Sequence, residues 1–222
     1  MSSLWIADRP RLNGRYRPVI RFAIVAILVA VSVTPRPQRK DAAVNRERVL
    51  DAATELVRRD GEKVPMADIA RAAGVGIGTV YRHFATRQDL FAALVHRSFE
   101  LALSNARAAA AAPGSAIDGI RVFFAATLRD RDRFVLPLHG GPPVFTPASR
   151  ELQAEVRGVL QTLLDRGHAA GQIRADLTPA DLIVATSLLS RPLPNTDDWD
   201  HLGNRQIDLM IEGLGPASTH EG

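Results

Sequence analysis

Three glycines at alternate positions mark the most distinctive stretch of this sequence, AGVGIGTVYRHF at residues 73–84. Glycines at such spacing bring backbone N–H groups close to phosphate, either in a nucleotide-binding loop or at the start of a helix. Thr79, Tyr81, Arg82 and His83 follow and supply hydroxyl, phenol and cationic hydrogen-bond donors. The chemistry of this stretch is therefore recognition of an anion, and the surrounding elements decide which one.

A nucleotide-binding loop does not fit the glycines. A dinucleotide site requires a strand followed by G-x-G-x-x-G, and an NTPase loop requires Gly-Lys-Ser/Thr. Here Gly74, Gly76 and Gly78 form G-x-G-x-G after a helical pattern. A helix-turn-helix fits better. Gly74 can adopt the positive φ that ends the first helix, and Gly76 and Gly78 leave the start of the next helix without bulky side chains. Val80 and Phe84 would then point inward and hold that helix against its neighbours.

Helical periodicity surrounds the glycines. Apolar residues recur at three- and four-residue spacing over residues 41–60, and short helices are expected at 66–73 and 77–84. Thr86 and Asp89 have the spacing of a capping box at the start of a long fourth helix.

The rest of the chain continues the helical pattern. Further helices are expected at residues 115–129, 149–170, 178–190 and 199–214, with a short apolar segment at 134–139. No strand pattern or repeat competes, so we expect an all-α fold with about nine helices.

Composition and charge indicate a globular protein with an anionic partner for one part only. Hydrophobic residues make up 46% and charged residues 23% of the 222 residues, and there is no cysteine. Residues 36–97 carry twelve basic and eight acidic side chains, a net charge of +4, whereas residues 98–222 carry eleven and fifteen, a net charge of −4. The absence of cysteine agrees with a reducing cytoplasm, where we place the protein.

Residues 1–35 stand apart. A basic start and the short apolar run at residues 22–33 are typical of a secretory signal, but the run is short for a membrane span. Because export would defeat a cytoplasmic DNA-binding domain, we interpret this part as an extension from a start placed too far upstream, or as disordered. Val33 then corresponds to a start codon. A real tether, which would make the protein a membrane-bound sensor, is the alternative.

The stretch Arg46–Leu94, with IARAAGVGIGTVYRHF and then TRQDL, resembles the DNA-binding domain of TetR/AcrR family transcriptional regulators. The segment GQIRADLTPADL, residues 171–182, is similar to the C-terminal domain of an SbtR-like subgroup. The resemblance implies a homodimer that binds a double-stranded DNA operator and responds to a small-molecule effector.

Carried over residue by residue, the resemblance implies that Thr79, Tyr81 and His83 contact phosphates or nearby base edges. Ile77, Gly78 and Arg82 would occupy positions that vary with operator sequence. Arg87 would hold a phosphate, and Arg46 or Arg48 would add a further phosphate contact. The chain departs from the family pattern at Pro65 and Gly76, where hydroxyl side chains are usual. A hydroxyl contact to the DNA backbone from either position is therefore in doubt.

An enzyme is not expected. The six histidines lack metal-ligand spacing, and His139-Gly-Gly resembles an esterase loop without the Gly-x-Ser-x-Gly that a hydrolase requires. We therefore expect no catalytic residue, no metal and no cofactor, and no stable membrane association.

A small-molecule pocket is expected where the aromatic residues concentrate, between the fifth and seventh helices. The candidate ligand-binding residues are Arg121, Phe124, Leu128, Phe134, Leu138, His139, Phe145 and His168. An ordinary helical core is the alternative for any one of them.

The last two helices carry more apolar surface than a small domain can cover. The candidate dimer-interface residues are Leu182, Leu189, Ile207, Met210, Ile211 and Leu214. The expected domains are an extension at 1–35, a helix-turn-helix domain at 36–95, a ligand-binding and dimerisation domain at 96–215 and a tail at 216–222. The expected function is ligand-responsive repression at a palindromic operator.

Overall fold

A computed structural model describes residues 37–139, 141–193 and 196–215 of the chain. The extension expected at residues 1–35 and the tail expected at 216–222 lie outside the described residues. From Val44 onward the chain forms one compact unit, and the contacts below belong to this unit.

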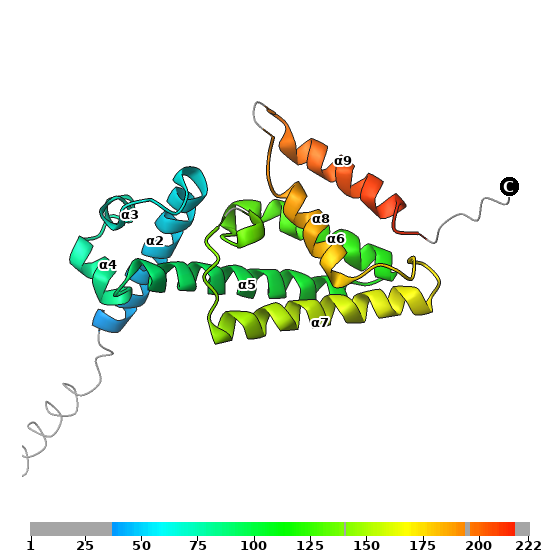
Figure 1. The fold of residues 1–222 in the computed structure, drawn as a ribbon, viewed down its shortest axis with the longest axis horizontal. Helices are drawn as coiled ribbons and strands as arrows, with labels where there is room; N and C mark the ends of the chain where they lie inside the picture. The colour runs from blue at the N-terminus through cyan, green and yellow to red at the C-terminus, as the bar shows by residue number, and fades with distance from the viewer. Residues whose placement is uncertain (1–36, 140, 194–195, 216–222) are drawn as a thin grey trace, which may run out of the picture. The chain divides into compact units, whose positions relative to one another are not determined.

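The regular structure of the described residues is entirely helical, which confirms the all-α class (Figure 1). Eight α-helices and two short 3-10 turns are present in these ranges, close to the expected nine helices. In chain order they are α2 Pro37–Asp60, α3 Met66–Ala72, α4 Ile77–His83, α5 Arg87–Ala111, α6 Ala116–Arg129, η1 Arg131–Arg133, η2 Pro137–His139, α7 Pro147–Ala169, α8 Pro179–Leu189 and α9 Trp199–Glu212.

Local side-chain chemistry sets several helix starts. The backbone N–H of Thr86 donates to the Asp89 carboxylate at 2.9 Å, and the N–H of Asp89 donates back to the Thr86 hydroxyl at 3.1 Å. This capping box satisfies two of the N–H groups that a helix start leaves unpaired, as the sequence predicts. Ser115 and Thr178 form the corresponding boxes before α6 and α8.

Helix α7 starts earlier than the sequence pattern suggests. Its first residue is Pro147, and Thr146 is the N-cap, so Ser149 occupies the third helical position instead of starting the helix. Proline is well suited to the first helical turn because its missing N–H would be unpaired there anyway. The prediction of a start at Ser149 is therefore wrong by two residues, since the Thr-Pro pair is the stronger start signal.

Two hydrophobic cores organise the compact unit. The first lies among α2, α3, α4 and the start of α5, and the second lies among the end of α5 and helices α6 to α9. Helix α5 belongs to both, and it runs without interruption past residue 95, where the sequence suggests a domain boundary. Helices α5 and α7 lie side by side in the second part (Figure 1).

The segment from Phe134 to Leu136 joins the two parts. Val135 is buried in the first core, whereas Phe134 and Leu136 pack with Phe99 in a small third cluster. The N–H of Val135 donates to the Ser98 hydroxyl of α5 at 2.9 Å. Alternate side chains of one short segment therefore contact the helix-turn-helix part and the C-terminal part.

None of the helices in the described ranges is long and apolar enough to cross a membrane. In the same ranges, no three His, Asp or Glu side chains gather closely enough to hold a metal ion.

Candidate functional site

The three glycines lie in the turn between α3 and α4 and in the first turn of α4. Gly74 has φ +66°, the left-handed conformation predicted from its position, and the N–H of the next residue, Val75, donates back to Ala70 O at 3.0 Å. Val80 and Phe84 are buried in the first core, also as predicted. The turn therefore fixes one face of α4 against the core and leaves the opposite face outward.

The outward face of α4 is unusually apolar and basic for a solvent-exposed helix. Ile77 is 42% and Tyr81 50% exposed, and Arg82 is exposed without an ion pair among the described residues. Gly78 is exposed too, and a Cβ placed there would meet nothing within 4 Å. No acidic residue lies on this helix. Thr79 and His83 are half-buried at its edges.

The other candidate DNA-contacting arginines differ in how they are held. Arg87 donates to the backbone oxygen of Glu62 at 2.6 Å and lies 6.0 Å from the Phe91 ring centre. Arg46 lies 5.4 Å over the Phe84 ring. Arg48 is exposed. Arg87 and Arg46 are thus pre-positioned beside α4, but each also stabilises the domain.

The starts of α3 and α4 are formed by the two residues that depart from the family pattern. Neither Pro65 before α3 nor Gly76 before α4 provides a side-chain cap. Pro65 and Gly76 themselves therefore offer no hydroxyl to a partner, and Thr79 is the hydroxyl residue in the first turn of α4.

The C-terminal part contains a partly open cavity of about 140 Å³ between α5, α6, α7, α8 and the segment that carries η2. Its walls are mostly aromatic and aliphatic. The lining residues are Phe99, Ala102, Phe123, Thr127, Phe134, Leu136, Pro137, Leu138, His139, Phe145, Gln153, Val156, Arg157, Ile183, Thr186 and Ser187.

His139 is the most unusual side chain of the lining. Its ring stacks on Phe134 with centres 5.1 Å apart, and neither ring nitrogen has a hydrogen-bond partner among the described residues. Burial, assisted by the positive charges of Arg58 and Arg191, lowers the pKa of His139 to about 4. The imidazole is therefore neutral at pH 7, with one N–H donor and one acceptor nitrogen.

The candidate ligand-binding residues divide into two groups of four. Phe134, Leu138, His139 and Phe145 line the cavity, as their clustering in the sequence suggests. The other four lie outside its lining, as the next paragraph describes.

Arg121 pairs with Asp208 of α9 at the surface. Phe124 and Leu128 are buried in the second core. Leu128 packs closely on Gly203 of α9, because a Cβ added to Gly203 would lie 2.7 Å from a methyl carbon of Leu128. His168 is half-buried in the last turn of α7.

Sequence reasoning missed the polar members of the cavity lining. Thr127, Thr186 and Ser187 are buried hydroxyl residues on the apolar faces of α6 and α8. A hydroxyl residue at a core position of an amphipathic helix is the signal that could have identified them. Gln153 and Arg157, one turn apart on α7, give no such signal.

A larger, charged groove of about 830 Å³ lies between α2, α5 and η1. Its charges pair with one another. Arg97 of α5 binds Asp51 at 2.7 Å and the Thr54 hydroxyl at 2.6 Å, and Arg58 binds Asp132 at 2.8 Å. Because its cations are already partnered, this groove offers less for a small ligand than the apolar cavity does.

The candidate dimer residues face the core of their own subunit. Met210 is half-buried against the second core, and the other five are buried in it: Leu182, Leu189, Ile207, Ile211 and Leu214. The exposed apolar side chains of the last two helices are others, namely Val184, Leu188, Leu202 and Leu209. The predicted residues therefore lie in the core of the chain itself, and the exposed apolar surface of α8 and α9 is made by the outward set.

Comparison with known proteins accounts for both parts of the chain. Residues 49–94 match the model of bacterial regulatory proteins of the tetR family. Residues 145–216 match the model of the SbtR-like transcriptional regulator C-terminal domain. These ranges correspond to the two segments whose resemblance the sequence indicates.

A solved structure extends the match over most of the chain. A TetR transcription regulatory protein from Mycobacterium vanbaalenii is 32% identical, with a TM-score of 0.56, and the match covers 81% of this chain and 99% of that one. The chain belongs to the TetR family. The TetR-family protein CprB from Streptomyces coelicolor, 19% identical with a TM-score of 0.64 over 81% of this chain and 93% of its own, shares the fold.

Curated relatives of this TetR-family chain match over a limited stretch. An HTH-type transcriptional regulator of Staphylococcus aureus is 37% identical over 68 residues, which is 30% of this chain and 37% of that protein. The match therefore spans little more than a third of the relative's length.

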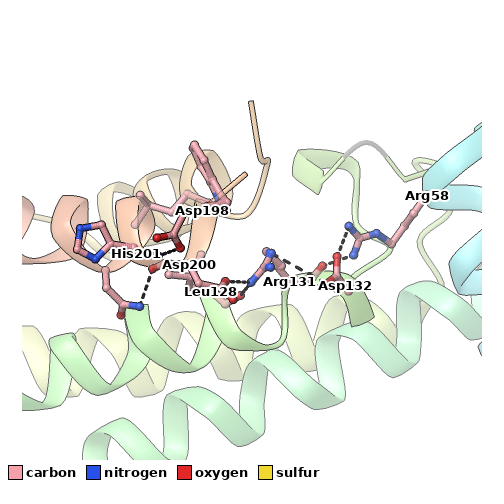
Figure 2. A network of polar contacts seen from close by, with 10 residues as sticks. Arg58, Leu128, Arg131, Asp132, Asp198, Asp200 and His201 are labelled. Carbon is pink, nitrogen blue, oxygen red and sulfur yellow. Dashed lines mark hydrogen bonds and ion pairs between the residues drawn. The ribbon is translucent and has the colours of Figure 1, made fainter. Parts of the chain in front are cut away.

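A chain of polar contacts connects α2 with α9 in this TetR-family protein (Figure 2). Arg58 of α2 pairs with Asp132 of η1 and donates to the backbone oxygen of Arg131. Arg131 in turn pairs with Asp200 of α9 at 2.6 Å and donates to Leu128 O at 3.1 Å. The segment 131–139 therefore touches the first helix of the helix-turn-helix part, the last helix and the cavity.

Proposed function

We propose that this chain is a homodimeric DNA-binding repressor that recognises a palindromic operator and releases it when a small molecule binds. The outward face of α4 carries the proposal. This short helix exposes Ile77, Tyr81 and Arg82 and contains no acidic residue, and Val80 and Phe84 bury its opposite face, which suits insertion into a major groove.

The side chains of α4 have distinct proposed roles. Arg82, Ile77 and Gly78 read base edges, because all three are exposed on the outward face. Thr79, Tyr81 and His83 bind phosphates or nearby base edges. Contacts to phosphate position the protein, whereas contacts to base edges specify the sequence.

The arginines beside α4 supply charge for the phosphate backbone. Arg48 is exposed and can extend to a phosphate, and Arg46 and Arg87 are held beside the reading helix by aromatic rings. Neutralised phosphates release counterions, so the affinity should fall as salt rises.

Two-fold symmetry follows from the proposed mode of reading. Two recognition helices must reach major grooves about 34 Å apart, which requires a dimer and a palindromic site. The outward leucines of α8 and α9 are the proposed self-complementary surface, packed as a four-helix bundle with the same helices of a second subunit.

The proposed effector site is the 140 Å³ cavity, and the segment 131–136 is its route to the DNA-binding part. Phe134 and Leu136 form part of the cavity wall, while Val135 between them is buried in the core that holds α4. A ligand that moves this wall must also move Val135, and with it the anchor on Ser98 of α5. The resulting shift of α5 changes the spacing of the recognition helices.

This coupling must be reciprocal. If the effector weakens operator binding by some factor, the operator must weaken effector binding by the same factor. Equal effector affinities for the free and the DNA-bound protein would contradict the proposed mechanism.

The decisive experiment is an in vitro selection from random duplex DNA with the purified protein at two salt concentrations. Enrichment of a palindrome whose half-sites lie about one helical turn apart is expected for a dimeric sequence reader. Salt-sensitive binding without enrichment would leave only a basic surface, and the roles of Ile77 and Arg82 would then be abandoned.

A further inference from the structure

The size of the cavity restricts its ligand. An engineered apolar cavity of about 150 Å³ in another protein holds one benzene molecule, whereas cavities for drug-sized ligands measure roughly 300 Å³ or more. At about 140 Å³, the cavity here suits one ring or an equally compact group. Four phenylalanines supply flat apolar walls for such a ring: Phe99, Phe123, Phe134 and Phe145.

The hydroxyl groups of the cavity can accept hydrogen bonds from a ligand, but their own protons already donate to backbone oxygens. Thr127 Oγ1 donates to Phe123 O at 2.9 Å. Thr186 and Ser187 donate to backbone oxygens of their own helix at 3.0 and 2.7 Å. Each hydroxyl proton is therefore engaged, and only oxygen lone pairs remain for a ligand.

His139 adds an unmet hydrogen-bonding demand. Neither of its nitrogens has a partner among the described residues, and a buried polar group without a partner costs about 1–3 kcal/mol. Because the imidazole is neutral, one nitrogen accepts a hydrogen bond. A ligand that donates to this nitrogen would remove part of that cost.

The charges near the cavity disfavour a cationic ligand. Its described lining contains Arg157 and no carboxylate, and the charges of Arg58 and Arg191 act on His139. The three hydroxyl groups offer only lone pairs, which disfavours a carboxylate beside them, and Arg157 makes a carboxylate the nearest rival.

We propose that the cavity binds an uncharged one-ring molecule with a hydroxyl group, a phenol or a cyclic alcohol, its ring against the phenylalanines and its hydroxyl on His139. The proposal rests on the proposed function, in which this cavity is the effector site. It adds the chemical class of the effector and the residue that recognises it.

The test compares phenol, toluene and benzoate, which place a hydroxyl, a methyl and a carboxylate on the same ring. Binding to the full chain is measured by titration calorimetry. Phenol is expected to bind about three- to tenfold more tightly than toluene, the ratio that one buried hydrogen bond provides. Equal affinities for phenol and toluene, tightest binding of benzoate, or no binding of any probe would each overturn the proposal.

Variants assign the preference to the proposed residues. His139→Phe keeps an aromatic ring beside Phe134 and removes both nitrogens, so it should abolish the preference for phenol and leave toluene binding intact. His201→Phe, at an exposed site on α9, is the matched control and should change neither affinity. If His139→Phe does not fold, His139→Leu tests the same point, because it also removes both ring nitrogens and should reduce the affinity for phenol relative to toluene.

A parallel measurement separates this proposal from the proposed function. The affinity for the selected operator DNA is measured with and without phenol. Phenol-selective binding that leaves the DNA affinity unchanged would support the ligand class and contradict the effector role. An enriched palindrome together with no phenol binding would support DNA recognition and overturn the ligand class.

Discussion

At the scale of single residues, two of the arginines proposed to contact DNA, Arg82 and Arg87, have different structural surroundings. Arg82 is exposed on α4 without an ion pair in the described part of the chain, whereas Arg87 is held by Glu62 O and the Phe91 ring. A substitution of Arg82 therefore reports on DNA alone, but a substitution of Arg87 also removes contacts that stabilise the domain.

We predict that Arg82→Ala changes the sequence preference of DNA binding. Loss of one base contact should cost about 1–3 kcal/mol on the selected operator and relax the preference at one position. Arg87→Ala should weaken binding to all sequences and reduce the salt slope by about one. Fluorescence anisotropy with operator and scrambled DNA measures both effects.

Arg59→Ala is the matched control for these arginine variants, because Arg59 lies at the far end of α2 and pairs with its neighbour Asp60. It should bind DNA like the parent protein. If Arg82→Ala lost affinity equally for every sequence, Arg82 would be reassigned to phosphate contact. Circular dichroism must first establish that both variants fold.

His139 also gives a pH prediction. Its pKa is about 4 in the folded protein and about 6.5 in an unfolded chain, so between these values the unfolded state binds more protons. The free energy of unfolding should therefore fall as pH drops below 6.5, by at most about 1.4 kcal/mol per unit from this group. Above pH 6.5 the group has no effect.

Urea unfolding between pH 7 and pH 4.5 measures this contribution as the difference between the parent protein and His139→Phe. That difference should be constant near pH 7 and should shift in favour of the variant as pH falls. A difference that stays constant over the whole range would mean that His139 takes up its proton in the folded state without cost. His201→Phe again serves as the exposed control.

At the scale of elements, the helix-turn-helix depends on glycines for two different reasons. Gly74 needs its positive φ, which an L side chain adopts at a cost of roughly 1–2 kcal/mol. Gly78 lies in helical conformation with open space at its Cβ position, so the fold does not require a glycine there. The open space beside Gly78 would allow the DNA to approach the backbone of α4 closely.

We predict opposite outcomes for alanine at these two positions. Gly74→Ala should lower the free energy of unfolding by about 1 kcal/mol or more. Gly78→Ala should raise it by up to about 1 kcal/mol, because alanine favours the helix, and should weaken operator binding by crowding the interface. Thermal unfolding and anisotropy on the same samples distinguish these effects; unchanged DNA affinity in folded Gly78→Ala would contradict close approach at this position.

The segment with Val135 gives a second prediction at this scale. Removing two buried methyl groups by Val135→Ala should cost about 1–3 kcal/mol and loosen the link between the helix-turn-helix and the cavity wall. Calorimetry should show an earlier, broader unfolding transition. Val122→Ala, exposed on α6, should unfold like the parent. A sharp transition at the parent temperature in Val135→Ala would show that the segment does not link the two parts.

At the scale of the whole molecule, the assignment of the dimer surface depends on which apolar residues face outward. Leu188 and Leu189 are neighbours in α8, yet Leu188 is 65% exposed and Leu189 only 4%. The first is available to a second subunit and the second is part of the protomer core.

These two neighbours therefore make a matched pair of variants. Leu188→Glu should dissociate the dimer, because a two-fold interface places the charge on both sides, while leaving the protomer folded. Leu189→Ala should lower the free energy of unfolding by about 2–5 kcal/mol. Analytical ultracentrifugation and urea unfolding measure the two quantities. A dimer that persists in Leu188→Glu would place the interface elsewhere.

The sequence by itself determined the helices, their caps and the reading turn, because these depend on neighbours within a few residues. The Thr86–Asp89 box, the left-handed Gly74 and the inward Val80 each follow from local chemistry and periodicity. The family resemblance depends on the same local pattern, which is why both the fold class and the DNA-reading helix could be predicted.

Only the tertiary structure decided which face of α8 points inward and which side chains share the cavity. Helix α8 is apolar on nearly every side, so its periodicity did not separate Leu189 from Leu188. From the sequence alone Arg121 could be a polar anchor for a ligand, but in the folded chain it pairs with Asp208 of α9. Burial and partnership of this kind depend on contacts between residues far apart in the chain, and a sequence pattern of short period carries no information about them.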